Sequence, residues 1–336
     1  MKSAVLGMGA WGTTFAQVLA DAGGEVTIWG RDQETASEIN SAHTNSKRLA
    51  GVDLHPAIRA TTDAQEALDG AELVIVAIPS QSARQILAPI APLVGPDAIA
   101  VSLMKGVELG TDQRMSEVLC EALNLPLDRV VVVSGPNLAA EIAAKQPTAT
   151  VVSGVNADNV AKVAAASSNS YFRPYTNHDL VGVELCGAVK NVIAVAVGMA
   201  QGKGFGHNTT ATIITRGLAE ITRLGLKLGA ELETFQGLAG MGDLIATCAS
   251  PLSRNHTLGK HIGQGLTLDQ AVAETGGTAE GAKSCRSVAA LAQHQGVEMP
   301  ITNAVVAVLY DGLPVDEMTR RLLSRPQKAE GAQYGL

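Results

Sequence analysis

Short apolar runs alternate with helical patterns over about the first 180 residues of the chain. The runs are rich in Val and Ile, which is typical of buried β-strands. Strands that alternate with helices form parallel sheets whose two faces the helices cover. We therefore predict an α/β fold with a doubly wound parallel sheet, whose strands are residues 3–6, 25–29, 73–78, 98–103, 130–134 and 149–153.

The pattern changes near His178. From there on, helical stretches rich in Ala, Leu and Val follow one another without a convincing strand, punctuated by glycines near Gly202, Gly240 and Gly276. We expect an α/β domain over residues 1–178 and an all-helical domain over residues 179–336. No Pro- or Ser-rich linker separates them, so this boundary depends on the change in periodicity alone.

The composition is typical of a folded protein of about two domains. The 336 residues are 46% hydrophobic and 17% charged, which is enough for a large core without disulfides. A net charge of -7 and an aromatic content of 3% disfavour a nucleic-acid partner. The four cysteines form no CxxC pair, the first residues lead directly into a strand, and no apolar stretch is expected to reach the roughly 18 residues of a membrane helix. We expect a cytoplasmic protein that does not insert into membranes.

Three glycines follow the first predicted strand in the order GxGxxG, at Gly7, Gly9 and Gly12. Two of them allow a tight turn and close approach to a pyrophosphate, and the third lets the helix expected at residues 13–20 pack on the strand. The helix N-terminus adds N–H groups and a positive dipole. This context favours a Rossmann-type dinucleotide site over a chance glycine turn.

The second strand ends in Trp29-Gly30-Arg31-Asp32 and lacks the terminal acidic residue that grips the ribose of NAD. We interpret Arg31 as a partner for the 2'-phosphate of NADP and Asp32 as the cap of the next helix. Arg31 stacked on adenine or facing solvent is the alternative. Trp11 either covers the cofactor or is an ordinary packing residue.

One lysine, Lys190, interrupts a segment at residues 178–200 that is apolar almost all round. On a helix it shares a face with Val183, Cys186 and Ile193, so its ammonium has no obvious route to solvent. Burial lowers the pKa of a lysine and makes it a usable acid and base near neutral pH. The alternative is a lysine in a structural ion pair, for which Glu184 is one candidate partner.

Two polar segments follow predicted strands. Lys105 comes after the strand at 98–103, at the carboxyl edge where such sheets bind ligands, although a loop lysine is often a solvated charge. The segment 134–139 follows the next strand. Gly135 and Asn137 with the nearby N–H groups therefore either meet a ligand or form a turn and helix cap.

The helical half holds a further candidate cluster. Arg254 offers a planar fork for phosphate, and its neighbours Ser253 and Asn255 add neutral hydrogen bonds. Asp243 either orients a lysine or a substrate hydroxyl, or caps its helix, and Cys248 is expected in the core. No metal site is expected, because these histidines lack HExxH or facial-triad spacing: His207, His256 and His261.

Taken together, the motifs resemble those of the bacterial NAD(P)-dependent glycerol-3-phosphate dehydrogenases. The resemblance runs almost end to end, through GMGAWGTTFA, WGRD, AIPS, LMKG, SGPNLAAEIA, VELCGAVKNVIAVAVG, GKGFGHNTTATIITRGLAE, GMGDLIATC, SRN and TAEG. It implies a Rossmann-type domain followed by a helical substrate-binding and catalytic domain. It also implies reduction of dihydroxyacetone phosphate to sn-glycerol 3-phosphate with NADP or NAD for phospholipid synthesis, without a metal, and a homodimer.

The resemblance carries over residue by residue. It implies that Lys190 transfers the proton and that Arg254 touches both ligands. It implies substrate contacts at Lys105, Gly135, Asn137, Lys190, Asp243, Ser253, Arg254 and Asn255. It implies cofactor contacts at Gly7, Gly9, Trp11, Gly12, Arg31, Lys105, Ala139, Arg254, Thr278 and Glu280.

Two motifs depart from the common family pattern. Asn137-Leu138 after Gly-Pro replaces the Ser-Phe or Thr-Phe that is often seen, and Thr278 replaces a frequent Val. Two other functions compete with the dehydrogenase. One is a related two-domain hydroxyacid dehydrogenase or ketopantoate-type reductase, which has no need of Arg254 for phosphate. The other is an NADPH sensor without turnover, which has no need of a buried lysine.

Overall fold

A computed structural model describes residues 1–276, 279–324 and 326. The chain forms two compact units, which we call the sheet unit and the helical unit. The sheet unit holds residues 1–104 and 115–180, and the helical unit holds residues 105–114 and 181–336. Periodicity did not reveal that residues 105–114 belong with the helices, because they form a short polar segment inside an α/β pattern.

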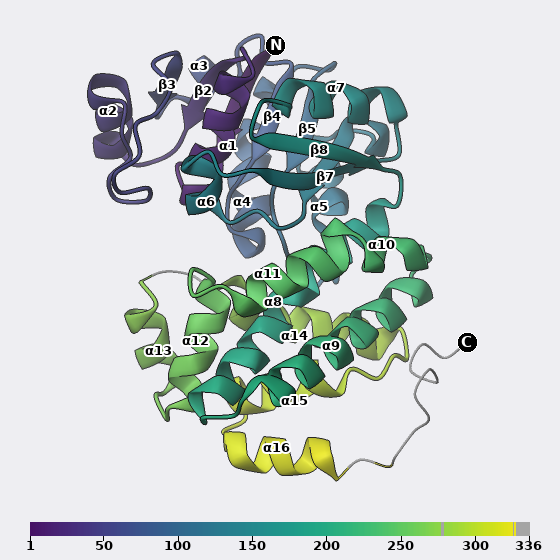
Figure 1. Cartoon of the computed structure of the whole chain (residues 1–336). Helices are drawn as coiled ribbons and strands as arrows, with labels where there is room; N and C mark the ends of the chain where they lie inside the picture. The colour runs from purple at the N-terminus through teal and green to yellow at the C-terminus, as the bar shows by residue number, and fades with distance from the viewer. Residues whose placement is uncertain (277–278, 325, 327–336) are drawn as a thin grey trace. The chain divides into compact units, whose positions relative to one another are not determined.

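The sheet unit contains an eight-stranded sheet of order β3-β2-β1-β4-β5-β6-β7-β8 (Figure 1). All neighbouring strands are parallel except β6 and β7, which are antiparallel. The strands are β1 (Lys2–Leu6), β2 (Glu25–Trp29), β3 (Ile58–Thr61), β4 (Leu73–Val76), β5 (Ile99–Ser102), β6 (Val130–Ser134), β7 (Thr148–Gly154) and β8 (Phe172–Asn177).

The doubly wound α/β prediction is confirmed, with corrections at the edges of the sheet. The prediction of a wholly parallel sheet was wrong for the pairing of β6 with β7, which is antiparallel. The sequence of an apolar strand does not show in which direction the strand pairs with its neighbour. The strands β3 and β8 were missed. Both lie at an edge, pair on one side only and carry mixed polar sequences. Pro174 fits β8 because an edge strand tolerates a missing N–H group.

Alternate residues of the central strands supply two cores. In β4, Ile75 packs on one face and Val76 on the other, as the period-two geometry of a strand requires. Side chains of α1 (Ala10–Asp21), α2 (Gln33–Ala42), α6 (Ala139–Ala143) and α7 (Ala157–Ser167) cover the first face. Side chains of α3 (Ala64–Leu68), α4 (Ala83–Leu87) and α5 (Met115–Leu123) cover the second.

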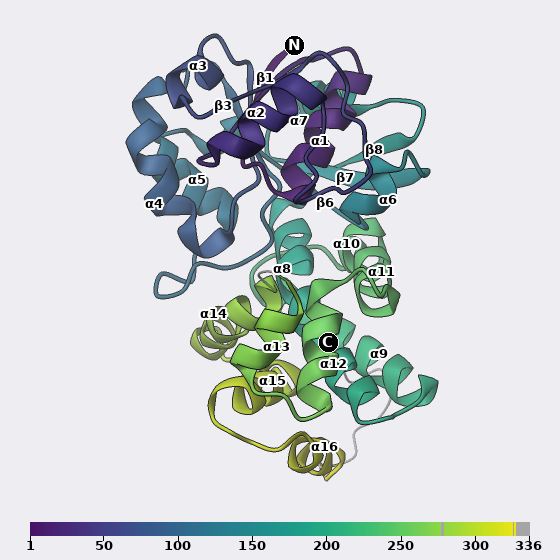
Figure 2. The same ribbon diagram turned by 90° about the vertical axis from the view of Figure 1, so that its left-hand side faces the viewer.

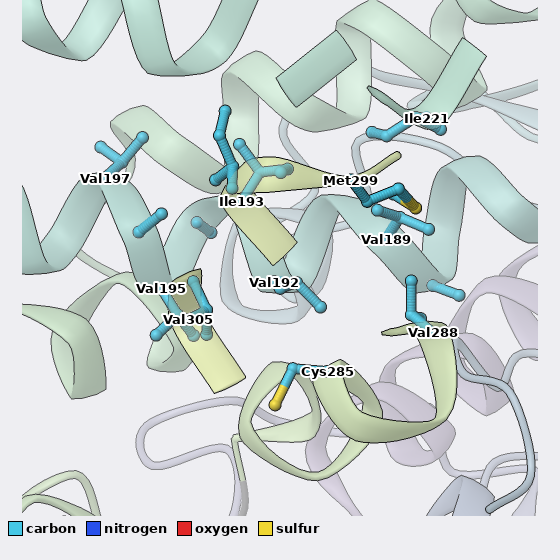
Figure 3. Packing of buried hydrophobic residues seen from close by; sticks show 14 of the residues in the cluster. Val189, Val192, Ile193, Val195, Val197, Ile221, Cys285, Val288, Met299 and Val305 are labelled. Atoms are coloured by element: carbon cyan, nitrogen blue, oxygen red, sulfur yellow. The ribbon is translucent and has the colours of Figure 1, made fainter. Parts of the chain in front are cut away.

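The helical unit is built around α8 (Leu180–Gly202), seen from a second side in Figure 2. Figure 3 shows Val192 and Ile193 of α8 among apolar side chains of other helices, including Ile221, Val288 and Val305. Its other helices are α9 (His207–Lys227), α10 (Leu232–Gln236), η4 (Leu238–Gly242), α11 (Asp243–Ala249), α12 (Arg254–Gly263), α13 (Leu268–Glu274), α14 (Glu280–His294), α15 (Pro300–Tyr310) and α16 (Val315–Leu323).

The expectation that no apolar stretch reaches the length of a membrane helix was wrong. α8 has 23 residues and is apolar enough to cross a membrane by length and composition. However, 94% of its most apolar window is buried inside the protein. This burial marks α8 as a core helix of the helical unit.

Helices α8 and α12 approach each other so closely that their backbones touch. A Cβ atom on Gly198 or Gly202 would collide with carbonyl oxygens of α12, and one on Gly259 or Gly263 with carbonyl oxygens of α8. Each pair is spaced four residues apart and therefore lies on one helix face. These glycines fix α12 against the helix that carries Lys190.

Candidate active site

The glycine loop after β1 has the geometry that a dinucleotide site requires. Gly7 has φ +126°, and a Cβ there would meet the carbonyl oxygen of Ala77 at 2.5 Å. A Cβ on Gly12 would collide with the carbonyl of Gly7, so α1 can pack here only with glycine. Gly9 faces open space and precedes α1 without a side-chain cap. The loop thus fits a pyrophosphate at an uncapped helix N-terminus.

Asn45, which was not predicted as a site residue, holds this loop in place. Its side-chain amide donates to the carbonyl of Met8 at 3.1 Å and to Thr13 Oγ1 at 2.9 Å, and the residue is fully buried. Thr14 Oγ1 donates to the carbonyl of Ala139 at 3.3 Å, so Ala139 lies beside α1. Asn45 lies in a loop that carries no recognisable sequence motif. Its role in holding the glycine loop is therefore visible only from the contacts in the structure.

The end of β2 confirms the capping role predicted for Asp32. Its carboxylate accepts from the N–H groups of Glu34 and Thr35, and Lys47 pairs with it at 3.2 Å. The hydrogen bond from the Thr35 backbone, followed by Lys47, lowers the pKa of this exposed carboxyl. The neighbouring Arg31 is exposed.

Trp11 packs edge-on against Phe15, with ring centroids 5.5 Å apart. Its indole Nε1 is buried and lacks a hydrogen-bond partner among the described residues. The packing interpretation therefore accounts for the ring.

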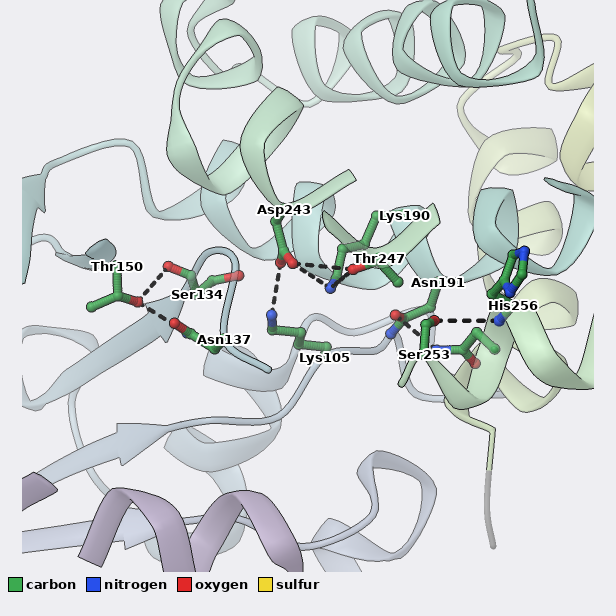
Figure 4. A network of polar contacts seen from close by, with 11 residues as sticks. Lys105, Ser134, Asn137, Thr150, Lys190, Asn191, Asp243, Thr247, Ser253 and His256 are labelled. Carbon is green, nitrogen blue, oxygen red and sulfur yellow. Dashed lines mark hydrogen bonds and ion pairs between the residues drawn. The ribbon is translucent and has the colours of Figure 1, made fainter. Parts of the chain in front are cut away.

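The turn after β6 is organised by Thr150, as Figure 4 shows. Asn137 donates to Thr150 Oγ1 at 3.0 Å, and Thr150 donates to the carbonyl of Ser134 at 3.0 Å. Asn137 Oδ1 is buried without a partner among the described residues. Gly135 has φ +138°, and Leu138 precedes α6 without a side-chain cap. Asn137 is thus held by β7 and does not cap α6.

Within the helical unit, Asp243 joins two lysines (Figure 4). Lys190 is 6% exposed and donates to Asp243 Oδ1 at 2.5 Å and to Thr247 Oγ1 at 2.6 Å. Thr247 donates to Asp243 Oδ1 at 3.2 Å, and Lys105 donates to Asp243 Oδ2 at 2.7 Å. Glu184, the candidate partner of Lys190 in the alternative interpretation, pairs with Arg114 instead.

The pKa of Lys190 is lowered to about 8, and burial is the largest cause of this shift. The positive charge of Lys105 lowers it further, and Asp243 opposes both effects. Lys190 is therefore near the midpoint of its titration at weakly alkaline pH. Burial raises the pKa of Cys248 to about 12, so this core residue stays a thiol.

The segment before and within α12 holds its polar groups in different ways. Ser253 caps α12 by accepting from the N–H of His256 at 3.3 Å. Asn255 donates to Asn191 Oδ1 at 3.0 Å and accepts from the N–H of Gly281 at 2.9 Å. Arg254 is exposed. This network brings Asn255 to the residue that follows Lys190.

The start of α14 carries Glu280 directly before Gly281, so the network places it beside Asn255. Thr278 lies outside the described residues.

Asn191 and Thr247 were not predicted as site residues. Their sequence positions could have indicated them, since Asn191 adjoins Lys190 and Thr247 lies one helical turn after Asp243. In the part of the chain that the structure describes, no group of three His, Cys, Asp or Glu residues is arranged to hold a metal.

A Rossmann-type sheet with an open glycine loop and a helical unit with a buried, polarised lysine define a two-domain NAD(P)-dependent oxidoreductase. Comparison with known proteins narrows this class. Residues 2–160 match the NAD-dependent glycerol-3-phosphate dehydrogenase N-terminus family, and residues 179–320 match the corresponding C-terminus family. The chain belongs to the NAD-dependent glycerol-3-phosphate dehydrogenases.

Relatives and solved structures agree with this assignment. The chain is 55% identical over 330 residues to a glycerol-3-phosphate dehydrogenase [NAD(P)+] of Streptomyces griseus, covering 98% of each. It is 54% identical over 335 residues to that of Frankia casuarinae, covering 100% of this chain and 99% of the relative. The glycerol-3-phosphate dehydrogenase structure from Coxiella burnetii has a TM-score of 0.91 at 34% identity, covering 96% of this chain and 98% of that one.

The rival reductases share the fold alone. A ketopantoate reductase from Ralstonia eutropha has a TM-score of 0.63 at 17% identity, covering 95% of this chain and 100% of that one.

Proposed function

We propose that this protein catalyses the NAD(P)H-dependent reduction of dihydroxyacetone phosphate to sn-glycerol 3-phosphate, reversibly, and supplies the backbone for phospholipid synthesis. Family membership carries the identity of the reaction. The observation that carries the chemistry is the buried contact of Lys190 with Asp243 and Thr247. We assign residues 1–178 to dinucleotide binding and residues 179–336 to substrate binding and catalysis, with Lys105 contributed to the second task.

Lys190 is the proton donor of the reduction in this proposal. Asp243 and Thr247 take two of the three ammonium hydrogens, which leaves one for a ligand oxygen. As the carbonyl oxygen of the substrate gains negative charge, the third N–H bond breaks and an O–H bond forms, leaving a neutral amine. In the reverse direction the neutral amine accepts the hydroxyl proton. A nicotinamide, when bound, would supply the hydride.

Lys105 and Asp243 would polarise and orient the substrate, while Arg254 and Asn255 would hold its phosphate. A planar guanidinium suits two-point phosphate binding, and the exposure of Arg254 leaves it accessible. The remaining substrate contacts proposed from the family are Ser253, Gly135 and Asn137.

The cofactor would lie on the glycine loop of the sheet unit. The open face at Gly9 and the uncapped start of α1 support a pyrophosphate there. We prefer NADPH to NADH, because the Asp32 carboxylate is engaged by α2 and Lys47, whereas Arg31 is exposed beside it. The full set proposed is Gly7, Gly9, Trp11, Gly12, Arg31, Lys105, Ala139, Arg254, Thr278 and Glu280.

The direct test is the initial rate of NADPH oxidation with dihydroxyacetone phosphate, measured beside unphosphorylated dihydroxyacetone and beside NADH. We expect turnover that requires the phosphate and is faster at low NADPH than at low NADH. Turnover of ketopantoate or a 2-keto acid in its place would favour the related reductases. Cofactor binding without oxidation by any carbonyl substrate would favour an NADPH sensor.

We further propose a homodimer in the cytoplasm, as the family resemblance implies. Light scattering on the purified protein should give twice the mass of one chain. A mass equal to one chain at micromolar concentration would contradict the dimer.

A further inference from the structure

Residues 105–114, which we call the strap, form a closed loop inside the helical unit. The backbone of Val107 pairs with that of Arg114 in an isolated antiparallel bridge. Within the loop, the N–H of Glu108 donates to the carbonyl of Gln113 at 2.9 Å, and Thr111 Oγ1 donates to Glu108 Oε2 at 2.7 Å. The strap is therefore internally fixed, and Val107 lies beside Arg114.

The strap is fastened to the helices at both ends of this loop. Val107 is fully buried in the core of the helical unit. Arg114 pairs with Glu184 of α8 at 2.6 Å, and the two side chains are 15% and 4% exposed. Asp112 pairs with His294 of α14 at 2.5 Å in a more exposed contact. A buried charge pair with good geometry ties its two backbones together, because breaking it leaves a charge without a partner.

We propose that Arg114 and Glu184 are positioning residues, which hold the strap so that the ammonium of Lys105 reaches Asp243. This inference rests on the proposed function. Lys105 stands at one end of the strap and Arg114 at the other, joined through the Val107–Arg114 bridge. Glu184 lies six residues before Lys190 on α8, a separation of about 9 Å along the helix axis. One rigid helix thus carries both the proton donor and the anchor of the second lysine.

The position of Lys105 has an electrostatic consequence at Lys190. Lys105 of the strap and Asp243 of α11 act on the pKa of Lys190 in opposite directions, and Cys248 of α11 lies close enough to be affected by both Lys190 and Asp243. Cys248 is a neutral thiol, so the balance lies between Lys105 and Asp243. If Lys105 leaves Asp243, the carboxylate acts on Lys190 alone and the pKa of Lys190 rises.

The experiment compares the pH dependence of kcat/KM for dihydroxyacetone phosphate reduction in four proteins. These are wild type, Lys105→Met, the double variant Arg114→Gln/Glu184→Gln, and the triple variant that combines all three substitutions. The double variant removes both members of the pair, so neither charge is left facing a missing partner. We expect the alkaline fall in activity to move to higher pH in the double variant, in the same direction as in Lys105→Met.

The triple variant separates positioning from general destabilisation. If Arg114 and Glu184 act through Lys105, kcat/KM of the triple variant falls at the same alkaline pH as that of Lys105→Met. An unshifted alkaline fall in the double variant, or a shift that adds to that of Lys105→Met, would overturn the proposal. Arg114→Lys keeps the charge and should restore most of the wild-type profile.

A second measurement needs no turnover and so distinguishes failure of this proposal from failure of the proposed function. The reactivity of each lysine toward an amine reagent is followed by mass spectrometry in the intact protein. We expect Lys105 to react several-fold faster in the double variant and Lys47 to react at its wild-type rate. Arg129→Gln, which breaks a pair with Asp97 in the sheet unit, is the matched control and should leave both rates unchanged. Equal Lys105 reactivity in wild type and double variant would refute positioning, whatever the activity.

Discussion

The chemistry of Lys190 follows from its surroundings at the scale of single side chains. Its burial was predictable, because an apolar helix face on both sides of a lysine leaves no route to water. Its partner was not, since Asp243 is 53 residues away in the chain and the nearer Glu184 was equally plausible from sequence. Local periodicity reports burial, whereas the choice between two carboxylates depends on how helices pack.

Replacing Lys190 by Met should lower kcat for dihydroxyacetone phosphate reduction by about 10²- to 10⁴-fold, the usual contribution of positioned acid-base catalysis. Asp243 keeps its contact with Lys105, so folding should persist. NADPH affinity, measured by fluorescence titration, should stay unchanged. Lys203→Met, which removes a surface pair with Asp316, is the control and should retain activity. Near-normal turnover of Lys190→Met would exclude the assigned role.

The pKa of Lys190, lowered to about 8 by burial, predicts opposite pH dependences for the two directions. Reduction needs the ammonium, so kcat/KM should fall as pH rises through about 8. Oxidation of sn-glycerol 3-phosphate needs the neutral amine and should rise over the same range. Rates measured between pH 6 and 10 in both directions check this. Parallel pH profiles for the two directions would argue for a different proton donor.

Arg31→Gln should weaken NADPH binding about tenfold, equivalent to ~1.4 kcal/mol, and leave NADH binding almost unchanged. The reason is that only NADPH carries the 2'-phosphate that the guanidinium would contact. Calorimetric titration of both cofactors measures the two constants. Arg59→Gln, at another exposed arginine of the sheet unit, serves as the control. Equal losses for both cofactors would place Arg31 on the adenine instead.

At the scale of elements, the sequence predicted what lies in the centre of each unit better than what lies at its edges. The central strands are apolar on both faces and are therefore easy to predict: β1, β4, β5 and β6. The edge strands β3 and β8 each pair with one neighbour and carry a polar side, so their sequences resemble loops. The glycine loop was predictable because backbone geometry requires glycine there. The glycine contact between α8 and α12 was not, since spacing alone does not say which helix is the partner.

Gly259→Ala should destabilise the protein by about 1–3 kcal/mol, the usual cost of overpacking, because its Cβ would collide with the carbonyl of Val195 on α8. Urea unfolding measures this loss. Gly237→Ala is a matched control, since φ is -87° there and a Cβ would make only ordinary contacts, the nearest at 3.5 Å. Equal stability of the two variants would mean that the helices can separate without loss.

At the scale of the whole molecule, the proposed site residues divide unequally between two compact units. The glycine loop, Arg31 and Ala139 belong to the sheet unit, whereas Lys190, Asp243, Thr247 and Lys105 belong to the helical unit. A sheet region followed by a helical region was predictable from periodicity and motifs. The exception is Lys105, which the sequence placed with the sheet because it follows β5. The chain crosses between units near residues 104, 114 and 180.

The strap also constrains how such genes recombine. A single crossover near residue 180 would build a chimaera whose strap comes from one parent and whose helices come from the other. Lys105 and Arg114 of one parent would then have to pair with the Asp243 and Glu184 of the other parent. An exchange that transplants the helical unit intact needs two further breakpoints, near residues 104 and 115. For shuffling among distant relatives, the heritable module is therefore discontinuous in the gene.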